Sequence, residues 1–323
     1  MQFASYLFPI ITVPYLSRVI GVEGYGKIAF ASAVMVWVQT VADWGFLLTA
    51  TRDVAKCRDN KAEVSRIFSE TFFARCLLAI VSFIFLCLLI LIVPDFKENA
   101  EILFVTFLMI PGYIMFPDWF FQAIERMRYT TITNLLVKTI FTVAVFIFIK
   151  EKGDYIIVPL LASLGTVAAG IIAMYLILKK WDYSLHRVSF HSVILAIKRS
   201  TDVFINNLFP NLYNSLSVVL LGIYDGSVAN GIYSEGNKFV NIGQSVLGVV
   251  TRVFFPFLSR RIDKHRIYVV VYMGATFCIA VILFVSAPWL IDWLYTDEFA
   301  DAIPVLRIMS ISLVFVAMST AYG

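Results

Sequence analysis

The sequence is organised as long apolar segments that are separated by short polar breaks. A helix needs about 20 apolar residues to cross roughly 30 Å of hydrocarbon, and most of the segments approach that length. Hydrophobic residues make up 60% of the chain and charged residues only 15%, whereas soluble domains carry about 25% charged residues. We therefore predict an all-α integral membrane fold with about ten transmembrane helices. The predicted spans are 1–16, 28–50, 72–93, 102–122, 132–149, 155–178, 200–222, 227–257, 267–289 and 302–323.

The two terminal segments are unusual. The segment 1–16 is short for a span and has neither the basic start nor the cleavage site of a signal peptide. The segment that reaches Gly323 stops within an apolar run. We expect the chain to be a fragment, or an unusually short member, of a longer protein.

Charge alternates between successive breaks. Those on one side are acidic or sparse in charge, with Asp95, Asp225 and Asp297 as examples. Because cytoplasmic loops are enriched in lysine and arginine, we place the basic breaks and the N-terminus in the cytoplasm; Arg18 and Lys27 are exceptions. The basic breaks are 51–71, 123–131, 179–199 and 252–266.

A weak internal repeat divides the chain. The tripeptide Leu-Phe-Pro at 7–9 recurs at 208–210, and glycines follow it in both copies. The glycine pairs are Gly21 with Gly222 and Gly26 with Gly231. Such parallel repeats occur in transporters, where the substrate site lies between the two lobes near the membrane midplane.

The repeat sets the predicted domain boundaries. We expect a six-helix N-terminal lobe over 1–178 with an incomplete first helix, and a basic cytoplasmic linker over 179–199. The C-terminal lobe over 200–323 would contain four helices and would therefore be incomplete.

Polar residues recur at helical spacing within several predicted spans. Lys138 lies between Asn134 and Thr142 at i, i+4 intervals, and Lys238 has Asn241 and Ser234 on the same face. Such side chains either form hydrogen bonds between helices or line a water-filled cavity. Two mid-span cations, one from each lobe, favour a cavity, and a cationic cavity suits an anionic headgroup such as a phosphate or pyrophosphate.

Other polar residues leave both interpretations open. Asn207 and Asn211 share a face, and interhelical hydrogen bonding is the simpler explanation for them. Arg75 lies near a predicted helix end, from which it could extend to the interface. Pro111 and Pro117 interrupt the span 102–122 and are equally consistent with a hinge and with a static kink.

Enzyme signatures are absent from the sequence. It contains no GxSxG, GxxxxGK[ST], GxGxxG or HExxH pattern. The four cysteines have no CxxC spacing, and the three histidines form no ligand pattern. We expect no enzymatic activity, no cofactor and no metal site.

Three motifs resemble those of the O-antigen and polysaccharide flippases. Residues 14–21, Pro-Tyr-Leu-Ser-Arg-Val-Ile-Gly, resemble the opening of that family, and Asp-Trp-Gly-Phe at 43–46 is similar to the end of its second helix. Residues 117–125, Pro-Asp-Trp-Phe-Phe-Gln-Ala-Ile-Glu, resemble its third signature. In the second lobe the family often shows Tyr-x-x-Ala-Glu-Lys, where this chain keeps Lys238 but has Asn237 before it and a new Glu235.

The resemblance implies a twelve-helix, two-lobe member of the multidrug/oligosaccharidyl-lipid/polysaccharide exporter superfamily. It implies movement of undecaprenyl-diphosphate-linked oligosaccharide, an O-antigen or capsule repeat unit, from the inner to the outer leaflet of the plasma membrane by alternating access. Membrane lipids, a glycan polymerase and a chain-length regulator would be its partners, with no role for nucleic acid.

On this hypothesis each polar residue receives a role. Lys138, Lys238 and Arg307 would be cavity cations, and Arg18 and Arg52 would guard the two mouths of the pathway. The substrate pathway would also include Asn207 and Asn211. Asp43 and Glu235 are candidates for ion coupling or charge pairing.

Two other functions are weighed against a flippase. An ion-coupled exporter of small cationic drugs, from the same superfamily, would line its cavity with acids rather than lysines. A membrane glycosyltransferase or polymerase would need a large catalytic loop, and the longest breaks here are only about 20 residues.

Overall fold

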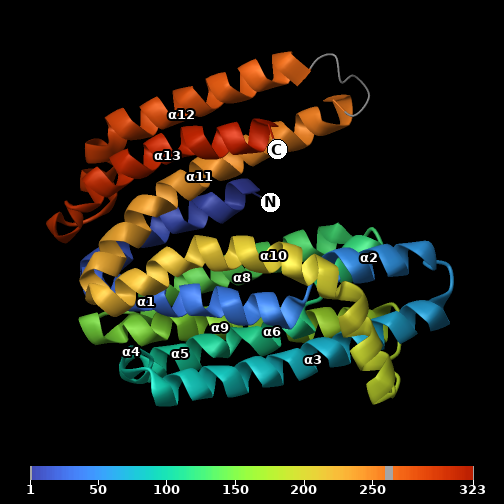
Figure 1. Ribbon diagram of the computed structural model, residues 1–323. Helices are drawn as coiled ribbons and strands as arrows, with labels where there is room; N and C mark the ends of the chain where they lie inside the picture. Colours follow the sequence, from blue (N-terminus) through green and yellow to red (C-terminus); the bar gives the residue numbers. More distant parts are fainter. Residues whose placement is uncertain (1, 259–264, 323) are drawn as a thin grey trace.

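The computed structural model describes residues 2–258 and 265–322. Within these ranges the regular secondary structure is helical and no strand occurs, which confirms the predicted all-α class (Figure 1). The α-helices are α1 (Gln2–Asp43), α2 (Phe46–Lys56), α3 (Lys61–Ile92), α4 (Pro94–Glu98), α5 (Ala100–Phe107), α6 (Met109–Met115), α7 (Asp118–Ala123), α8 (Met127–Phe148), α9 (Ile157–Tyr175), α10 (Phe190–Tyr224), α11 (Gly226–Leu258), α12 (His265–Leu294) and α13 (Ala302–Tyr322). Two 3₁₀ helices, η1 (Lys152–Ile156) and η4 (Asp297–Phe299), and a π-helix, η2 (Leu176–Lys180), complete the described elements.

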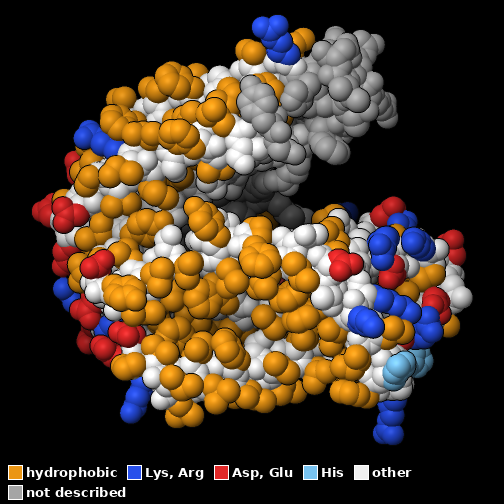
Figure 2. All heavy atoms as spheres, in the orientation of Figure 1, with side chains coloured by type: hydrophobic (Ala, Val, Ile, Leu, Met, Phe, Trp, Pro, Cys, Tyr) orange, Lys and Arg blue, Asp and Glu red, His pale blue; other side chains and the backbone are white. Residues whose placement is uncertain are grey.

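The apolar composition of the helices explains why they form a membrane fold. Their outward faces are covered with large apolar side chains, such as Leu91 and Ile92 at more than 70% exposure, and Figure 2 shows them covering most of the visible surface. Among the described residues, seven helical stretches are long and apolar enough to cross a bilayer, and the described parts of α10 and α11 are not among them. The integral membrane class is thus confirmed, and the count of ten crossings stays a prediction. The seven stretches are Ile11–Lys56, Lys61–Ile92, Ala100–Ala123, Met127–Phe148, Lys152–Lys180, Arg266–Leu294 and Ala302–Ser319.

The first helix is a pair of helices joined at a single residue. Gly21 has a φ of 65° and a ψ of −177°, a conformation open to glycine, and the two halves of α1 fold back on one another there (Figure 1). A connection of one residue replaces the break over 17–27 that separates the predicted spans 1–16 and 28–50.

In the second repeat, two helices are also joined at a glycine with a positive φ, but the glycine lies at a different position relative to the Leu-Phe-Pro tripeptide. Helices α10 and α11 meet at Gly226, whose φ is 83°. The structural counterpart of Gly21 is therefore Gly226 rather than Gly222, and the offset between them is the offset between Gly26 and Gly231. The second copy carries four more residues between its Leu-Phe-Pro tripeptide and this turn. Four residues are close to one helical turn, so the added length preserves the buried face.

The predicted span 102–122 is broken into α5, α6 and α7. Pro111 has no N–H to donate four residues back, to the carbonyl of Phe107, and α5 ends there. Phe116 precedes Pro117 and has a ψ of 83°, because a residue before proline is driven out of the α region. The breaks are present, and their use as a hinge stays a prediction.

The helices form two groups with a hollow between them. Helices α11, α12 and α13 lie above the layer of α3, α5, α6, α8 and α9 (Figure 1). Helix α10 packs along α1, and it also contacts α3 and α11. The division into 1–178, 179–199 and 200–323 stays a prediction.

Candidate functional site

The hollow between the two groups of helices is a cleft that is open at one end. Figure 2 shows it widening towards the end of the molecule that carries α2 and the α2–α3 connection. We call this the basic end, because Arg52, Lys56 and Arg66 lie there. The opposite, acidic end holds Glu23, Asp225 and Glu298 and is closed by contact between α1 and α11.

A cavity of about 320 Å³ contains Lys138. It is formed by the first half of α1 together with α6, α8 and α9. The predicted face of α8 is confirmed, because Asn134, Lys138 and Thr142 all line this one cavity. The remaining polar residues lining it are Thr12, Tyr113 and Thr166.

Thr142 lines this cavity with a hydroxyl group whose hydrogen bonding is unsatisfied among the described residues. Its hydroxyl is buried and has no partner among the described residues. A buried hydroxyl without a hydrogen bond costs about 1–3 kcal/mol, so a bound group that pairs with it would recover that energy. A hydroxyl donor close to an ammonium group is an arrangement suited to an oxyanion such as a phosphate.

Lys238 lies in a separate, tightly paired cluster. Its Nζ is 2.5 Å from Glu235 Oε2, and the Tyr295 hydroxyl donates to the same oxygen at 2.5 Å. The ammonium also lies 5.3 Å from the ring centroid of Tyr25. Glu235 is 4% exposed and places a buried acid beside Lys238, where Asn237 is uncharged. The structure does not place Lys238 in the Lys138 cavity.

Asp43 is paired as well, with a partner that the sequence did not indicate. It accepts a hydrogen bond from Arg75 Nη2, and Asp118 at the start of α7 interacts electrostatically with both. The expectation that Arg75 extends to the interface is wrong, because the residue is 5% exposed and points inward to α1. Arg75 Nε has no hydrogen-bond partner among the described residues.

The other predicted cations lie apart from the cavity. Arg18 is exposed three residues before Gly21, towards the acidic end, and Arg52 is exposed at the basic end with its Nε 3.2 Å from Asp53 Oδ1. Arg307 donates from Nε to the Phe284 carbonyl at 3.4 Å, which places it against α12. None of the three lines the Lys138 cavity.

A line of polar contacts, which we call the polar seam, joins α10 to α1 and α2. Trp37 Nε1 donates to Ser215 at 2.6 Å, and Asn211 donates to Thr40 at 2.9 Å. Trp44 stacks on Phe204 with ring centroids 3.7 Å apart. Asn211 thus forms the interhelical hydrogen bond expected of it, whereas Asn207 is exposed. The seam ends with the hydroxyls of Thr49 and Ser200, 2.7 Å apart.

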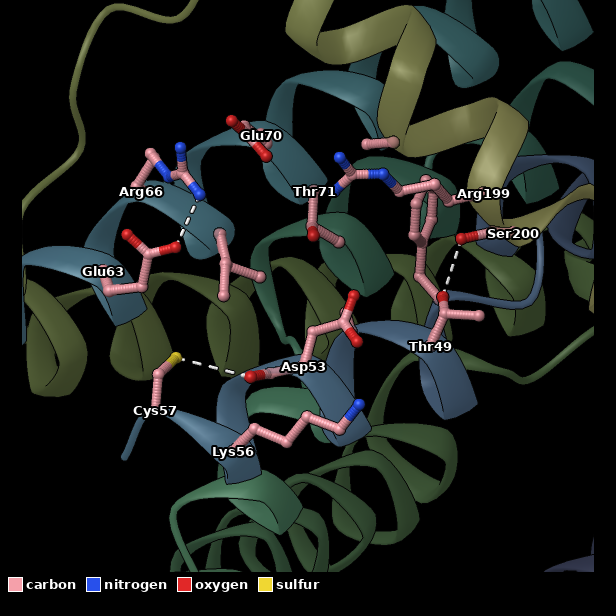
Figure 3. Close-up of a pocket in the computed structure, with 14 residues that line it drawn as sticks. Thr49, Asp53, Lys56, Cys57, Glu63, Arg66, Glu70, Thr71, Arg199 and Ser200 are labelled. Atoms are coloured by element: carbon pink, nitrogen blue, oxygen red, sulfur yellow. Dashed lines mark hydrogen bonds and ion pairs between the residues drawn. The ribbon is translucent and has the colours of Figure 1, made fainter. Parts of the chain in front are cut away.

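A second cavity, of about 350 Å³, lies at the basic end between α2, α3 and α10 (Figure 3). Three of its acidic side chains face three basic ones, so the cavity has no net preference for either sign of charge. Burial raises the pKa of the Cys57 thiol at its edge, which leaves that thiol protonated and unreactive. The charged residues are Asp53, Lys56, Glu63, Arg66, Glu70 and Arg199.

Comparison with known proteins places this architecture in a family. The chain is 28% identical to a putative O-antigen transporter of Escherichia coli (strain K12), over 100% of this chain and 80% of that protein. It is 24% identical to a putative O-antigen transporter of Shigella dysenteriae, over 98% of this chain and 81% of that protein. No solved structure matches the chain. Residues 1–262 match the model of the polysaccharide biosynthesis protein family, and the chain belongs to that family.

Proposed function

We propose that the protein is a flippase for undecaprenyl-diphosphate-linked oligosaccharide in the bacterial plasma membrane. It moves the lipid-linked O-antigen or capsule repeat unit from the inner to the outer leaflet by alternating access, and it catalyses no covalent step. The basic end faces the cytoplasm, as does the N-terminus, in agreement with the positive-inside rule.

The observation that carries the proposal is the Lys138 cavity between α1, α6, α8 and α9. The Lys138 ammonium and the unpaired Thr142 hydroxyl would bind the diphosphate group. At an effective dielectric constant of 20, a charge pair at 4 Å is worth about 4 kcal/mol. That energy retains an anion without preventing its release.

The pairing of Asp43 and Glu235 with cations supports this choice over a drug exporter. A transporter of small cations needs carboxylates directed into its cavity. Asp43 is bonded to Arg75, and Glu235 is bonded to Lys238 and Tyr295. We assign Lys238 and Arg307 to the substrate pathway outside the Lys138 cavity. A glycan polymerase and a chain-length regulator are the proposed partners.

The proposal is tested by the leaflet distribution of undecaprenyl-linked oligosaccharide in cells that lack the gene. We expect the lipid to accumulate on the cytoplasmic face and the intact gene to relieve the accumulation. Lys138→Ala should fail to relieve it, Lys138→Arg should relieve it in part, and exposed Lys61→Ala should behave as the wild type. Export at the wild-type rate by both Lys138→Ala and Lys238→Ala would contradict the cationic cavity. A normal lipid distribution together with drug sensitivity in the deletion strain would favour the drug exporter.

A further inference from the structure

Two cations lie over one pair of aromatic rings at the basic end. Trp181, which follows η2, packs edge-on against Tyr129 of α8, with ring centroids 5.1 Å apart. The Arg126 guanidinium lies 4.6 Å from the ring centroid of Trp181. The Lys180 ammonium lies 5.5 Å from the ring centroid of Tyr129. Both distances are short enough for a cation–π interaction, so the four side chains form one group, which we call the aromatic–basic cluster.

Two turns of the main chain position this cluster. The N–H of Arg126 donates to the Phe121 carbonyl at 2.9 Å and closes the end of α7. The N–H of Trp181 donates to the Leu176 carbonyl at 3.0 Å and closes the π-helix η2. Trp181 is only 7% exposed, whereas Arg126 and Lys180 are both exposed. The indole ring is therefore a packed base beneath two cations that solvent or lipid can reach.

The acidic side chains next to the cluster in sequence pair with other cations. Glu125 Oε1 is 3.0 Å from Arg58 Nη1. Asp182 Oδ2 is 3.6 Å from Lys61 Nζ. Among the described residues, no carboxylate forms an ion pair with either cation of the cluster. The two positive charges are thus uncompensated, and their mutual repulsion favours the binding of an anion.

The cluster lies where two membrane-spanning stretches end on the same side. The stretch Met127–Phe148 begins beside Arg126, and the stretch Lys152–Lys180 ends within the cluster. Within about two helical turns of these ends, both helices carry exposed apolar side chains, such as Ile132 in α8 and Tyr175 in α9. A lipid bound here can place an anionic headgroup against the cluster and a hydrocarbon chain along the helices.

We propose that the aromatic–basic cluster binds the headgroup of an anionic phospholipid in the leaflet at the basic end. Among the described residues, the side-chain N–H groups of Arg126 donate no hydrogen bond, so they are available to phosphate oxygens. Anionic lipids of the cytoplasmic leaflet attract basic residues in this position. The occupant is a phospholipid rather than the lipid-linked cargo, because the cluster contributes no residue to the Lys138 cavity. The inference uses the proposed orientation but not the flippase activity.

The test measures lipid binding to the purified protein by native mass spectrometry, with phosphatidylglycerol and phosphatidylcholine titrated separately. Arg126→Gln should weaken phosphatidylglycerol binding roughly fivefold, and Arg126→Gln with Lys180→Gln roughly twentyfold, because each cation contributes to binding. Phosphatidylcholine binding should not change. Arg66→Gln with Arg187→Gln is the matched control, since it removes the same charge from exposed side chains at the basic end. The control should leave phosphatidylglycerol binding nearly unchanged.

Two outcomes would overturn the proposal. Equal weakening in the cluster variant and in the control would show an effect of net charge alone. Displacement of phosphatidylglycerol from the wild type by added undecaprenyl diphosphate would assign the cluster to the cargo. All four substituted side chains are exposed, so the variants should unfold at the same temperature as the wild type. Lipid binding is measured without cargo, so a protein that binds phosphatidylglycerol as expected and exports no glycan would refute the proposed function alone.

Discussion

Each group of helices contains one buried ion pair, and the two pairs are built in opposite ways. In Asp43–Arg75 the cation is the buried partner, with side-chain exposures of 6% for Arg75 and 39% for Asp43. In Glu235–Lys238 the acid is buried, at 5%, and the lysine is 35% exposed. The first pair joins α1 to α3, whereas the second lies within one turn of α11.

The difference determines which pair can change its charge. A buried guanidinium cannot lose its proton in a protein and therefore requires an acid beside it. A buried carboxyl group can become neutral, and Tyr295 would still form a hydrogen bond with it. We infer that Asp43–Arg75 is structural and that Glu235 is the better candidate for ion coupling.

The comparison predicts the largest loss of stability for Asp43→Ala. The change leaves Arg75 buried without its bonded carboxylate, at a cost of about 2–3 kcal/mol in the free energy of unfolding. This is at or below the low end of the range for buried pairs, because Asp43 is partly exposed. Unfolding by detergent titration in lipid bicelles measures it. Asp53→Ala, which breaks an exposed pair, is the control and should cost less than about 1 kcal/mol. Equal losses in the two variants would contradict the structural role.

Lys238→Met should cost less, about 1–2 kcal/mol, because Glu235 keeps its hydrogen bond from Tyr295. The same titration applies. Adding Glu235→Gln should recover part of the loss, since no buried charge then remains. A loss larger than that of Asp43→Ala would reverse the comparison.

Tyr295→Phe removes one hydrogen bond to Glu235 and leaves the ion pair intact. We expect a loss of about 1 kcal/mol. In a double-mutant cycle with Lys238→Met, the double variant should lose more stability than the sum of the two single losses. The reason is that Lys238 and Tyr295 both bind the same oxygen atom of Glu235. Simple additivity would show that the two contacts are independent.

Asn211→Ala should have the smallest effect, about 0.6 kcal/mol, the average for an interhelical hydrogen bond in a membrane. This variant compares the stability that an uncharged hydrogen bond contributes with the stability that the two ion pairs contribute. A loss above that of Tyr295→Phe would mean that this bond of the polar seam contributes more to stability than the hydrogen bond between Tyr295 and Glu235.

Much of the helix pattern could be predicted from the sequence. Apolar length located the spans, and the i, i+4 spacing of Asn134, Lys138 and Thr142 placed them on one face that lines one cavity. These features depend on residues close together in the chain. Asp43 was predicted either to couple an ion or to pair with one of the proposed pathway cations, and the partner in the structure is Arg75, which was not among them.

Contacts between helices were not predictable in the same way. Which helix packs on which depends on side chains far apart in the sequence, as in the bond between Trp37 and Ser215. Arg75 lies near a predicted helix end, and this position suggested that its side chain extends to the interface. In the structure α3 packs on α1, and this packing directs the side chain of Arg75 inward. The equivalence of Gly21 with Gly226 was hidden by the four-residue insertion, because only the backbone dihedrals identify the turn.

The contact between α1 and α11 that closes the acidic end, at Gly26 and Gly231, has an electrical consequence. In the proposed orientation, water that fills the cleft from the basic end would bring the cytoplasmic potential inward, so the membrane voltage would fall mainly across the short segment around Gly26 and Gly231. One elementary charge crossing 100 mV gains about 2.3 kcal/mol. The contact between the two main chains would then lie where the electric field is steepest.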